Sequence, residues 1–433
     1  MTSGVPESSA FRRRSRWAML LRVVALVALV CTLLAIDGAP LVDAPQPPDA
    51  RSVDLARGVV KQIAGQDAVA GAREVITLRQ SELDGFSALA SQVMAPIRTE
   101  AKLIAPSPGS AEPPTIVLRL SRSLPLGAWL NLEARAHSVG KGQGLPVVQG
   151  QIGQLPVPAW LMRLAMRHAW SIAQPDEPDA PTLEETLPQV QIASEQVRVV
   201  LINPGRNAAL AGLAQLGGTA SDRRWVARAY CLLARHADAD LAAIVRRAWR
   251  LDRPAQLDPV EQNRALLIAV AMRTVPEYRD RLAGAALPLI EGCTNPEQTA
   301  TLAGRNDLAK HWALSAALGA SLGGQAAQSL GAFKELSDSL KGGSGFSFVD
   351  LAADRSGERF ARAATNPQLA RFVQTRLAAV TQDQLLAREA LARPEGLDAA
   401  LFEQTYSNID SPEYARALAK IDRLLDNVGV PKP

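Results

Sequence analysis

Residues that could perform acid–base or metal chemistry gather between Asp307 and Gly357. The chain has only four histidines, and one of them, His311, lies here among acidic residues at helical spacings. Asp307 precedes His311 by four residues, so the two side chains share one face of a helix. An aspartate that hydrogen-bonds an imidazole fixes its tautomer and raises its basicity, as a general base or a metal ligand requires. The alternative is an ordinary polar pair near a helix N-terminus.

Two acids in the same stretch lack a local partner. The neighbours of Glu335 and Asp354 at three and four residues are small, apolar or acidic, so neither acid has a cation on its own helical face. Such an acid is either solvated or satisfied by a group that is distant in the sequence. His311, Glu335 and Asp354 are therefore the principal candidates for a catalytic or metal site.

Three further acids are supporting residues, because local pairing explains each of them. Asp307 is the partner expected for His311, and Asp338 follows Lys334 by four residues, which predicts a surface ion pair. Asp350 follows Ser347 by three residues, which is the spacing of a capping box at a helix N-terminus.

The three principal residues suit two kinds of chemistry if a helical bundle brings them together. One nitrogen and two carboxylates can bind a divalent cation, and the same groups can serve as base and acid in catalysis. Their spacing matches neither the Glu-x-x-His pair of di-iron bundles nor the His-Glu-x-x-His motif of zinc proteases. A buried polar network that only orders the helices is the third interpretation. We predict that His311, Glu335 and Asp354 converge within about 8 Å, the limit for one coordination sphere.

Other cofactors and a serine nucleophile are not expected. Ser315 lies four residues beyond His311, but a row along one helix cannot arrange a nucleophile, a base and an orienting acid. A divalent metal is the one cofactor that the pattern suggests.

The elements that must position these residues are helices. Residues 205–433 contain apolar residues at three- and four-residue spacing, without strand patterns and without a fixed repeat. We predict a mainly α-helical domain over 205–433, with helices at 225–234, 241–251, 260–275, 308–322, 329–340, 348–363 and 414–428.

Residues 53–204 predict an α+β domain ahead of the helices. Alternating patterns bounded by glycine and proline predict strands at 74–78, 115–120, 129–136, 147–155, 190–192 and 197–202. A helix should begin near Ser81, and residues 160–172 predict a basic amphipathic helix.

The first 52 residues carry signals of membrane attachment. Residues 1–16 form a basic tail, and residues 17–36 are apolar apart from Arg22. A run of about 20 residues can span a bilayer, an arginine near its end can reach the headgroups, and arginines before a span stay in the cytoplasm. We predict a single transmembrane signal-anchor at 17–36 and a proline-rich linker at 37–52. A cleaved signal peptide is the alternative, because the uncharged run covers only Val23–Ile36.

This orientation places the body of the chain outside the cytoplasm. The alanine- and arginine-rich composition suggests a bacterial inner-membrane protein that faces the periplasm. Residues 1–22 hold five arginines and one acid, which account for the net charge of +4, and the remainder is balanced at 42 basic and 42 acidic residues. A balanced body without a basic stripe does not predict nucleic acid as a partner.

Cys231 and Cys293 are the cysteines of the body. An oxidising compartment permits a disulfide between them, and two buried free thiols are the alternative. Neither belongs to a Cys-x-x-Cys pair, so zinc binding and dithiol redox chemistry at these cysteines are not expected.

Residues 70–203 resemble extracytoplasmic domains of the YpmS type. The likeness rests on Leu78-x-x-Ser81-Glu82-Leu83, Ile116-x-Leu118, Trp129-Leu130-Asn131-Leu132 and Ile152-Gly153-x-Leu155-Pro156-x-Pro158. Domains of this type follow an N-terminal anchor and lack an assigned chemistry. The resemblance implies a fold and a topology, and it transfers no catalytic residue.

Residues 307–357 resemble small envelope lipoproteins of the YfiM type and, more distantly, VanZ-like membrane proteins. The likeness rests on Asp307-x-x-x-His311-Trp312-x-x-Ser315, Lys334-Glu335-x-x-Asp338-Ser339 and Asp350-Leu351-x-x-Asp354-x-x-Gly357. It implies that His311, Glu335, Asp338, Asp350 and Asp354 belong together in a helical unit. This chain departs from the pattern because it has no lipobox, and the resemblance implies no reaction.

Two functions follow from these patterns. The first is a non-catalytic inner-membrane protein, anchored through 17–36, that binds an envelope lipid, glycan or protein. The second is a hydrolase or transferase on an envelope lipid or glycan, with His311 as base and Glu335 or Asp354 as acid or metal ligand.

Overall fold

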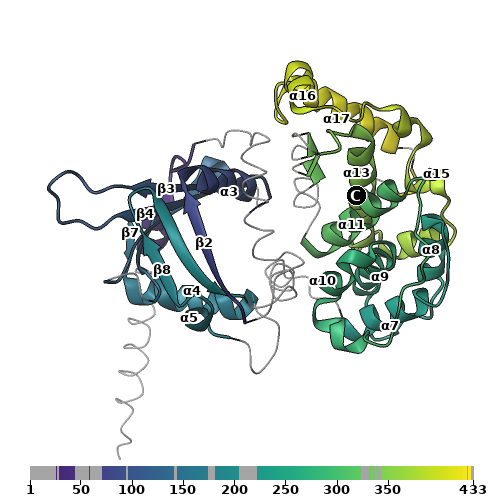
Figure 1. The fold of residues 1–433 in the computed structure, drawn as a ribbon, viewed down its shortest axis with the longest axis horizontal. Coiled ribbons are helices and arrows are strands. Elements are labelled where there is room, and N and C mark those ends of the chain that lie inside the picture. Colours follow the sequence, from purple (N-terminus) through teal and green to yellow (C-terminus); the bar gives the residue numbers. More distant parts are fainter. Residues whose placement is uncertain are drawn as a thin grey trace, which may run out of the picture.

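The computed structural model describes most of the two predicted domains. Its described residues are 29–43, 71–93, 96–140, 144–173, 181–203, 222–322, 331, 332, 334, 335, 338, 339, 343–426 and 428–430, with positions 26 and 58. Figure 1 shows the strands gathered in one body and the helices that follow residue 222 in a second. The predicted succession of a sheet-rich N-terminal region and a helical C-terminal region is confirmed.

The predicted anchor at 17–36 falls largely outside the described residues, as does the basic tail at 1–16. Residues 29–35 are helical, and Leu29 and Leu33 expose 56% and 64% of their surface. In the part of the chain that the structure describes, no helix combines the length and the apolar character that crossing a membrane requires.

The larger sheet is an antiparallel meander in which each strand pairs with the next. Its path is β3 (Ile97–Ile104), β4 (Thr115–Ser123), β5 (Trp129–His137), β6 (Val147–Ile152) and β7 (Leu155–Val157). The sequence predicted one strand over 147–155, but Gly153, at a φ of +55°, turns the chain back and makes two. Strand β3 was not predicted, although Arg98, Glu100 and Lys102 alternate along it with apolar or small residues.

A smaller antiparallel sheet packs against the first. It has the order β2 (Arg73–Arg79), β9 (Gln196–Ile202) and β8 (Gln189–Ile192). A core shared by both sheets includes Ala101, Ile116 and Val197, and Leu83 of helix α3 (Gln80–Val93) closes it. Helix α4 (Ala159–Ala173) packs on β6, and the short α5 (Leu183–Thr186) follows it.

The first residues of the predicted linker at 37–52 belong to the larger sheet, so the prediction is wrong there. Strand β1 (Ile36–Asp37) pairs with β5, and the backbone N–H groups of Leu41 and Val42 donate to the Ser121 hydroxyl. Asn131 donates to the Asp37 carboxylate at 2.8 Å. Polar groups on β4 and β5 therefore hold residues 36–43 against the sheet, while 44–52 lie outside the described residues.

The second body is helical, and most of its boundaries agree with the predicted spans. Side-chain caps start many of its helices, as Asp222, Asp240, Asp258 and Ser347 show by accepting backbone N–H groups. The α-helices are α7 (Arg223–Leu233), α8 (Leu241–Trp249), α9 (Pro259–Thr274), α10 (Arg279–Ala283), α11 (Asn306–Leu322), α13 (Phe348–Ala364), α14 (Ala370–Leu377), α15 (Gln382–Leu385), α16 (Ala399–Tyr406) and α17 (Pro412–Leu425). The predicted helix at 329–340 is described only in part, and its described positions 331, 332, 334, 335 and 338 are helical.

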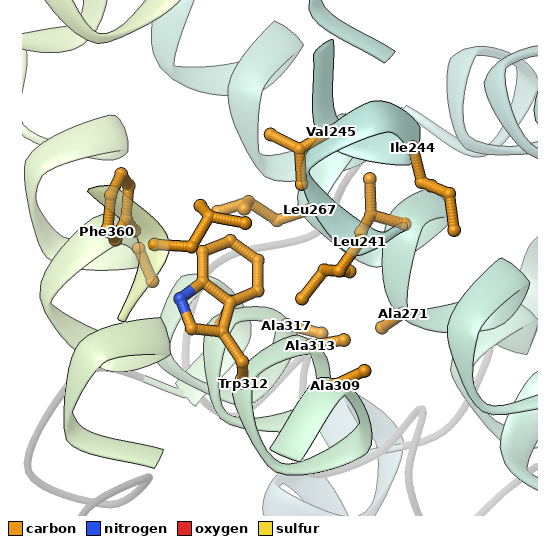
Figure 2. Close-up of a cluster of buried hydrophobic side chains, with 14 of the residues drawn as sticks. Leu241, Ile244, Val245, Leu267, Ala271, Ala309, Trp312, Ala313, Ala317 and Phe360 are labelled. Carbon is orange, nitrogen blue, oxygen red and sulfur yellow. The ribbon is translucent and has the colours of Figure 1, made fainter. Parts of the chain in front are cut away.

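Trp312 lies at the centre of the helical core. Figure 2 shows its indole among Leu241 of α8, Leu267 of α9 and Phe360 of α13, and the Trp312 and Phe360 rings meet edge to face at 5.4 Å. On α13, a Cβ at Gly357 would overlap the carbonyl oxygen of Trp312, so only glycine allows α11 and α13 to approach so closely. This close approach sets the distance between the polar residues on the two helices.

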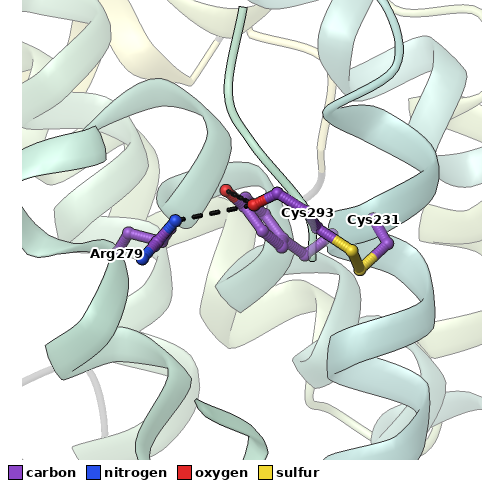
Figure 3. Close-up of a disulfide and its surroundings, with 4 residues drawn as sticks. Cys231, Arg279 and Cys293 are labelled. Atoms are coloured by element: carbon purple, nitrogen blue, oxygen red, sulfur yellow. Dashed lines mark hydrogen bonds between the residues drawn. A yellow bond between two sulfur atoms is a disulfide. The ribbon is translucent and has the colours of Figure 1, made fainter. Parts of the chain in front are cut away.

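Cys231 and Cys293 form a disulfide, so the alternative of two free thiols is wrong. The bridge joins α7 to the segment after α10, and its Cα atoms lie 5.2 Å apart. Tyr230 and Arg279 both donate to the carbonyl oxygen of Cys293, at 3.4 Å and 3.5 Å (Figure 3). Cys31 is a free, exposed cysteine.

Candidate metal centre

His311 of α11 pairs with Asp354 of α13. Its Nδ1 lies 3.0 Å from Asp354 Oδ1, and both side chains are buried, at 8% and 4% exposure. An ionised carboxylate can only accept a hydrogen bond, so Nδ1 carries the proton and donates it. Asp354 therefore fixes the ring and directs Nε2 to the opposite side.

Nε2 of His311 faces two more carboxylates. It lies 3.5 Å from Asp350 Oδ2 and 3.9 Å from Glu335 Oε1. One donor atom from each of His311, Glu335 and Asp350 lies within 4.8 Å of the other two, so this buried group could hold a metal ion. The predicted convergence of His311, Glu335 and Asp354 is confirmed by the distances from the imidazole to both carboxylates.

Glu335 is wholly buried and is held from two sides. Its Oε1 accepts from the Lys334 ammonium at 2.9 Å, and its Oε2 accepts from the Ser347 backbone N–H at 3.0 Å. Glu335 has no cation three or four residues away in the sequence, but the adjacent Lys334 contacts it. Glu335 thus connects its own helical stretch to the N-terminus of α13.

The backbone N–H of Asp350 takes part in the cap of α13, and its carboxylate faces His311. The Ser347 hydroxyl accepts the Asp350 N–H at 3.0 Å, so Ser347 caps α13 as the spacing predicted. In a full capping box the Asp350 carboxylate would also accept the Ser347 N–H. Here that N–H donates to Glu335 instead. The Asp350 carboxylate is therefore free of the cap and lies between His311 and, at 3.5 Å, Arg305.

The two carboxylate oxygens of Asp354 have different surroundings. Oδ1 accepts from His311 and from the Ser315 hydroxyl, the latter at 2.7 Å. Among the described residues, Oδ2 is buried without a hydrogen-bond partner and lies beside Gly331, where a Cβ would be 2.8 Å away. Ser315 donates to this acid rather than to His311 Nε2, so the described residues contain no serine–histidine nucleophile here.

Two supporting residues have partners outside the cluster. Asp307 was predicted to orient His311, but its carboxylate accepts from the Arg305 guanidinium at 2.6 Å, and Asp354 takes the role instead. Asp338 pairs with Lys334 at 2.7 Å, so the predicted ion pair is confirmed.

The electrostatics of the centre favour a bound positive charge. Burial disfavours the charged imidazole, yet the Asp354 carboxylate outweighs it, and the pKa of His311 rises to about 9. Burial raises the pKa of Glu335 to about 7 against the effect of Lys334, and burial also raises the pKa of Asp350. Several titratable groups with displaced pKa values in one pocket are typical of a functional site.

A pocket with a volume of about 790 Å³ opens over the centre. His311, Asp350 and Asp354 line it, and Leu314 and Leu318 of α11 form part of an apolar wall. Its lining includes five carboxylates and three permanent cations, which leaves a net charge of −2 before His311 is counted. The carboxylates are Glu277, Asp307, Asp350, Asp354 and Glu395, and the cations are Arg305, Lys310 and Lys334.

Some residues of the centre were not selected from the sequence. Arg305 forms ion pairs with Asp307, Glu395 and Asp350. The turn at Ala303 and Gly304 that precedes Arg305 was not predicted from the sequence. Ser315 was set aside as a nucleophile, although its spacing of four from His311 did signal the shared face. Lys334 was recognised only as the partner of Asp338.

Comparison with known proteins adds no relative to this description. No protein-family model, no curated protein and no solved structure matches the chain. The resemblances to YpmS-type and YfiM-type proteins therefore stay predictions from sequence.

Proposed function

We propose that the helical domain binds one divalent cation through His311, Glu335 and Asp350. The carrying observation is the direction of His311 Nε2, which Asp354 turns toward two carboxylates that do not satisfy it. A lone pair that faces two negative charges is unfavourable, so a cation must lie between them, either a proton or a metal ion. Carboxylate-oriented histidines of this kind are typical of metal centres.

The distances between the three donor atoms favour a metal ion. Ligands bound at about 2.1 Å in a tetrahedral site lie about 3.4 Å apart. The distances from Nε2 to Asp350 Oδ2 and Glu335 Oε1 are 3.5 Å and 3.9 Å, and the latter is too long for a hydrogen bond. One nitrogen and two oxygens suit zinc or manganese, with the pocket side left for water or a ligand.

The surroundings of the centre support the same occupant. The net charge of the lining is negative, and a divalent cation would neutralise it. The buried Oδ2 of Asp354, which has no donor among the described residues, adds negative potential beside His311. Lys334 disfavours a bound cation, because its ammonium already neutralises the Glu335 carboxylate.

A cation at this position would serve to bind a ligand in the pocket above it. The apolar wall and the acidic floor suit an amphiphile whose anionic group coordinates the metal. With the anchor predicted from residues 17–36, this makes the chain a metal-dependent binding protein for an envelope lipid or glycan at the outer face of a bacterial inner membrane.

The second candidate is a hydrolase or transferase on the same ligands. The observation in its favour is that His311 and Asp350, two of the three proposed ligands, line the pocket, because a metal-bound water there would face a substrate. Turnover of a lipid or glycan ester that disappears together with the bound metal would establish this function over binding alone.

Metal content and zinc affinity test the proposal. Purified full-length protein should contain about one zinc or manganese by elemental analysis, and calorimetry of the chelator-treated protein should show one site. Asp350→Asn removes a ligand and should weaken zinc binding by roughly 10-fold or more. Glu277→Gln is the matched control, because Glu277 lines the same pocket but pairs with Lys310 at 2.6 Å.

A second variant separates a metal centre from a purely structural ion network. Lys334→Met removes a cation that competes for Glu335, so zinc should bind more tightly while the metal-free protein loses stability. Protein that purifies without metal and binds neither zinc nor manganese would refute the proposal. An Asp350→Asn variant that binds zinc as well as the wild type would also refute the ligand set.

A further inference from the structure

Helix α4 carries an exposed face that the metal centre does not explain. Trp160, Leu161 and Leu164 expose 68%, 38% and 57% of their surface. Arg163 and Arg167 are exposed on the same helix, next to this apolar stripe. Large apolar side chains flanked by arginines are typical of a helix that lies in a membrane interface.

The other face of α4 fixes its orientation on the domain. Met162 packs against Gly150 of β6, where a Cβ would collide with its sulfur. Trp170 donates its indole N–H to the Pro181 carbonyl at 3.0 Å, and Arg167 pairs with Glu184 of α5. Packing of Met162 and Trp170 therefore holds the stripe of Trp160, Leu161 and Leu164 outward.

The turn that precedes β7 and α4 contacts a second exposed apolar segment. The N–H of Gln154, in the turn before β7, donates to the Leu34 carbonyl at 2.7 Å, and Gly153 packs against the same backbone. Leu34 lies in the last turn of the helical residues 29–35, whose Leu29 and Leu33 are exposed. Only β7 and Pro158 separate this junction from the start of α4.

We propose that α4 lies on the surface of an anionic bilayer and forms a second membrane contact beside the N-terminal segment. Trp160 and Leu164 would enter the headgroup region, and Arg163 would meet lipid phosphates, while Arg167 stays paired with Glu184. The contact of Gly153 and Gln154 with Leu34 joins the N-terminal segment to the turn that precedes β7 and α4. The proposal rests on the membrane location proposed above and is independent of the metal centre.

Site-directed fluorescence quenching in vesicles tests this proposal with the full chain. In a Cys31→Ser background, a bimane label is attached at Leu164→Cys, or at Leu401→Cys of α16 as the matched control. Leu401 is a comparably exposed leucine, at 45%, in the helical body. The vesicles contain phosphatidylcholine with phosphatidylglycerol and a lipid that carries a shallow doxyl quencher.

The label at 164 should lose most of its fluorescence in these vesicles, and the label at 401 should not. Arg163→Glu should reduce the quenching at 164 while the protein stays bound to the vesicles through its N-terminal segment. Protein that floats with the vesicles but shows no quenching at 164 overturns the role of α4 and leaves the anchor intact. Protein that does not associate with vesicles at all overturns both the anchor and this proposal. Without lipid, the label at 164 could still become shielded from water. If this shielding rises with protein concentration, the exposed face of α4 belongs to a contact with a second copy of the chain instead.

Discussion

Metal-free protein should lose stability as the pH rises from about 7 to about 9.5, and His311 should cause the loss. The pKa of His311 is about 9 in the folded protein and ordinarily 6.5, because Asp354 outweighs the cost of burial. Above pH 6.5 the unfolded chain has released a proton that the folded protein still holds. Stability from this group is therefore complete below 6.5 and disappears as the pH passes 9.

The magnitude follows from the two pKa values. The rise from 6.5 to about 9 corresponds to about 3 kcal/mol, at 1.36 kcal/mol for each tenfold change in proton affinity. Glu335, whose burial raises its pKa to about 7, produces a separate decline that is nearly complete where this window begins. The pKa of Lys334 is raised above its ordinary 10.5, so this group acts at higher pH.

The assay is urea unfolding in the presence of a chelator at a series of pH values. Wild type should lose stability across the window, and His311→Gln should be less stable but almost independent of pH there. A proton NMR titration of the imidazole should give the same pKa. Equal slopes for wild type and variant, or an imidazole that titrates near 6.5, would refute the assigned interaction with Asp354.

Two further predictions concern the scaffold that holds the centre. Gly357→Ala should gain about 1 kcal/mol of stability from helix propensity but lose more through overlap of the new Cβ with the Trp312 carbonyl. The net loss of stability should be about 2 kcal/mol, and zinc should bind more weakly. Gly292→Ala is the control in the same unfolding experiment, because a Cβ there meets open space. Replacing Cys231 and Cys293 with serine should cost up to about 4 kcal/mol, because the bridge closes 62 residues of chain. Unfolding with and without reductant measures that loss, and a variant that matches the oxidised wild type would contradict it.

The secondary structure of this protein follows largely from local pattern. Apolar spacing of three and four residues predicted α7, α8, α9, α11 and α13 to within a few residues, because each helix buries one face or is buried entirely. Strand β3 was missed although its charged residues alternate with apolar or small ones, and these charges pair across the sheet, as Glu100 does with Arg119 at 3.1 Å. A single sequence does not contain that partnership.

The sequence by itself determined which polar residues the helical domain must accommodate. It singled out Glu335 and Asp354, since neither has a cation three or four residues away, and His311, since it is the one histidine among these acids. It also assigned Asp338 to Lys334, because a helix alone brings residues four apart together.

Only the tertiary structure decided which acid serves the histidine. Spacing along one helix favoured Asp307, yet that acid binds Arg305, and Asp354 reaches His311 from another helix. Gly357 permits this, because α13 can approach the backbone of α11 only where no Cβ intervenes. The Ser347 N–H donates to Glu335, whereas in a capping box it would donate to Asp350. The Asp350 carboxylate can therefore belong to the centre. Such contacts depend on the distance and rotation between helices, which packing sets and local sequence spacing does not.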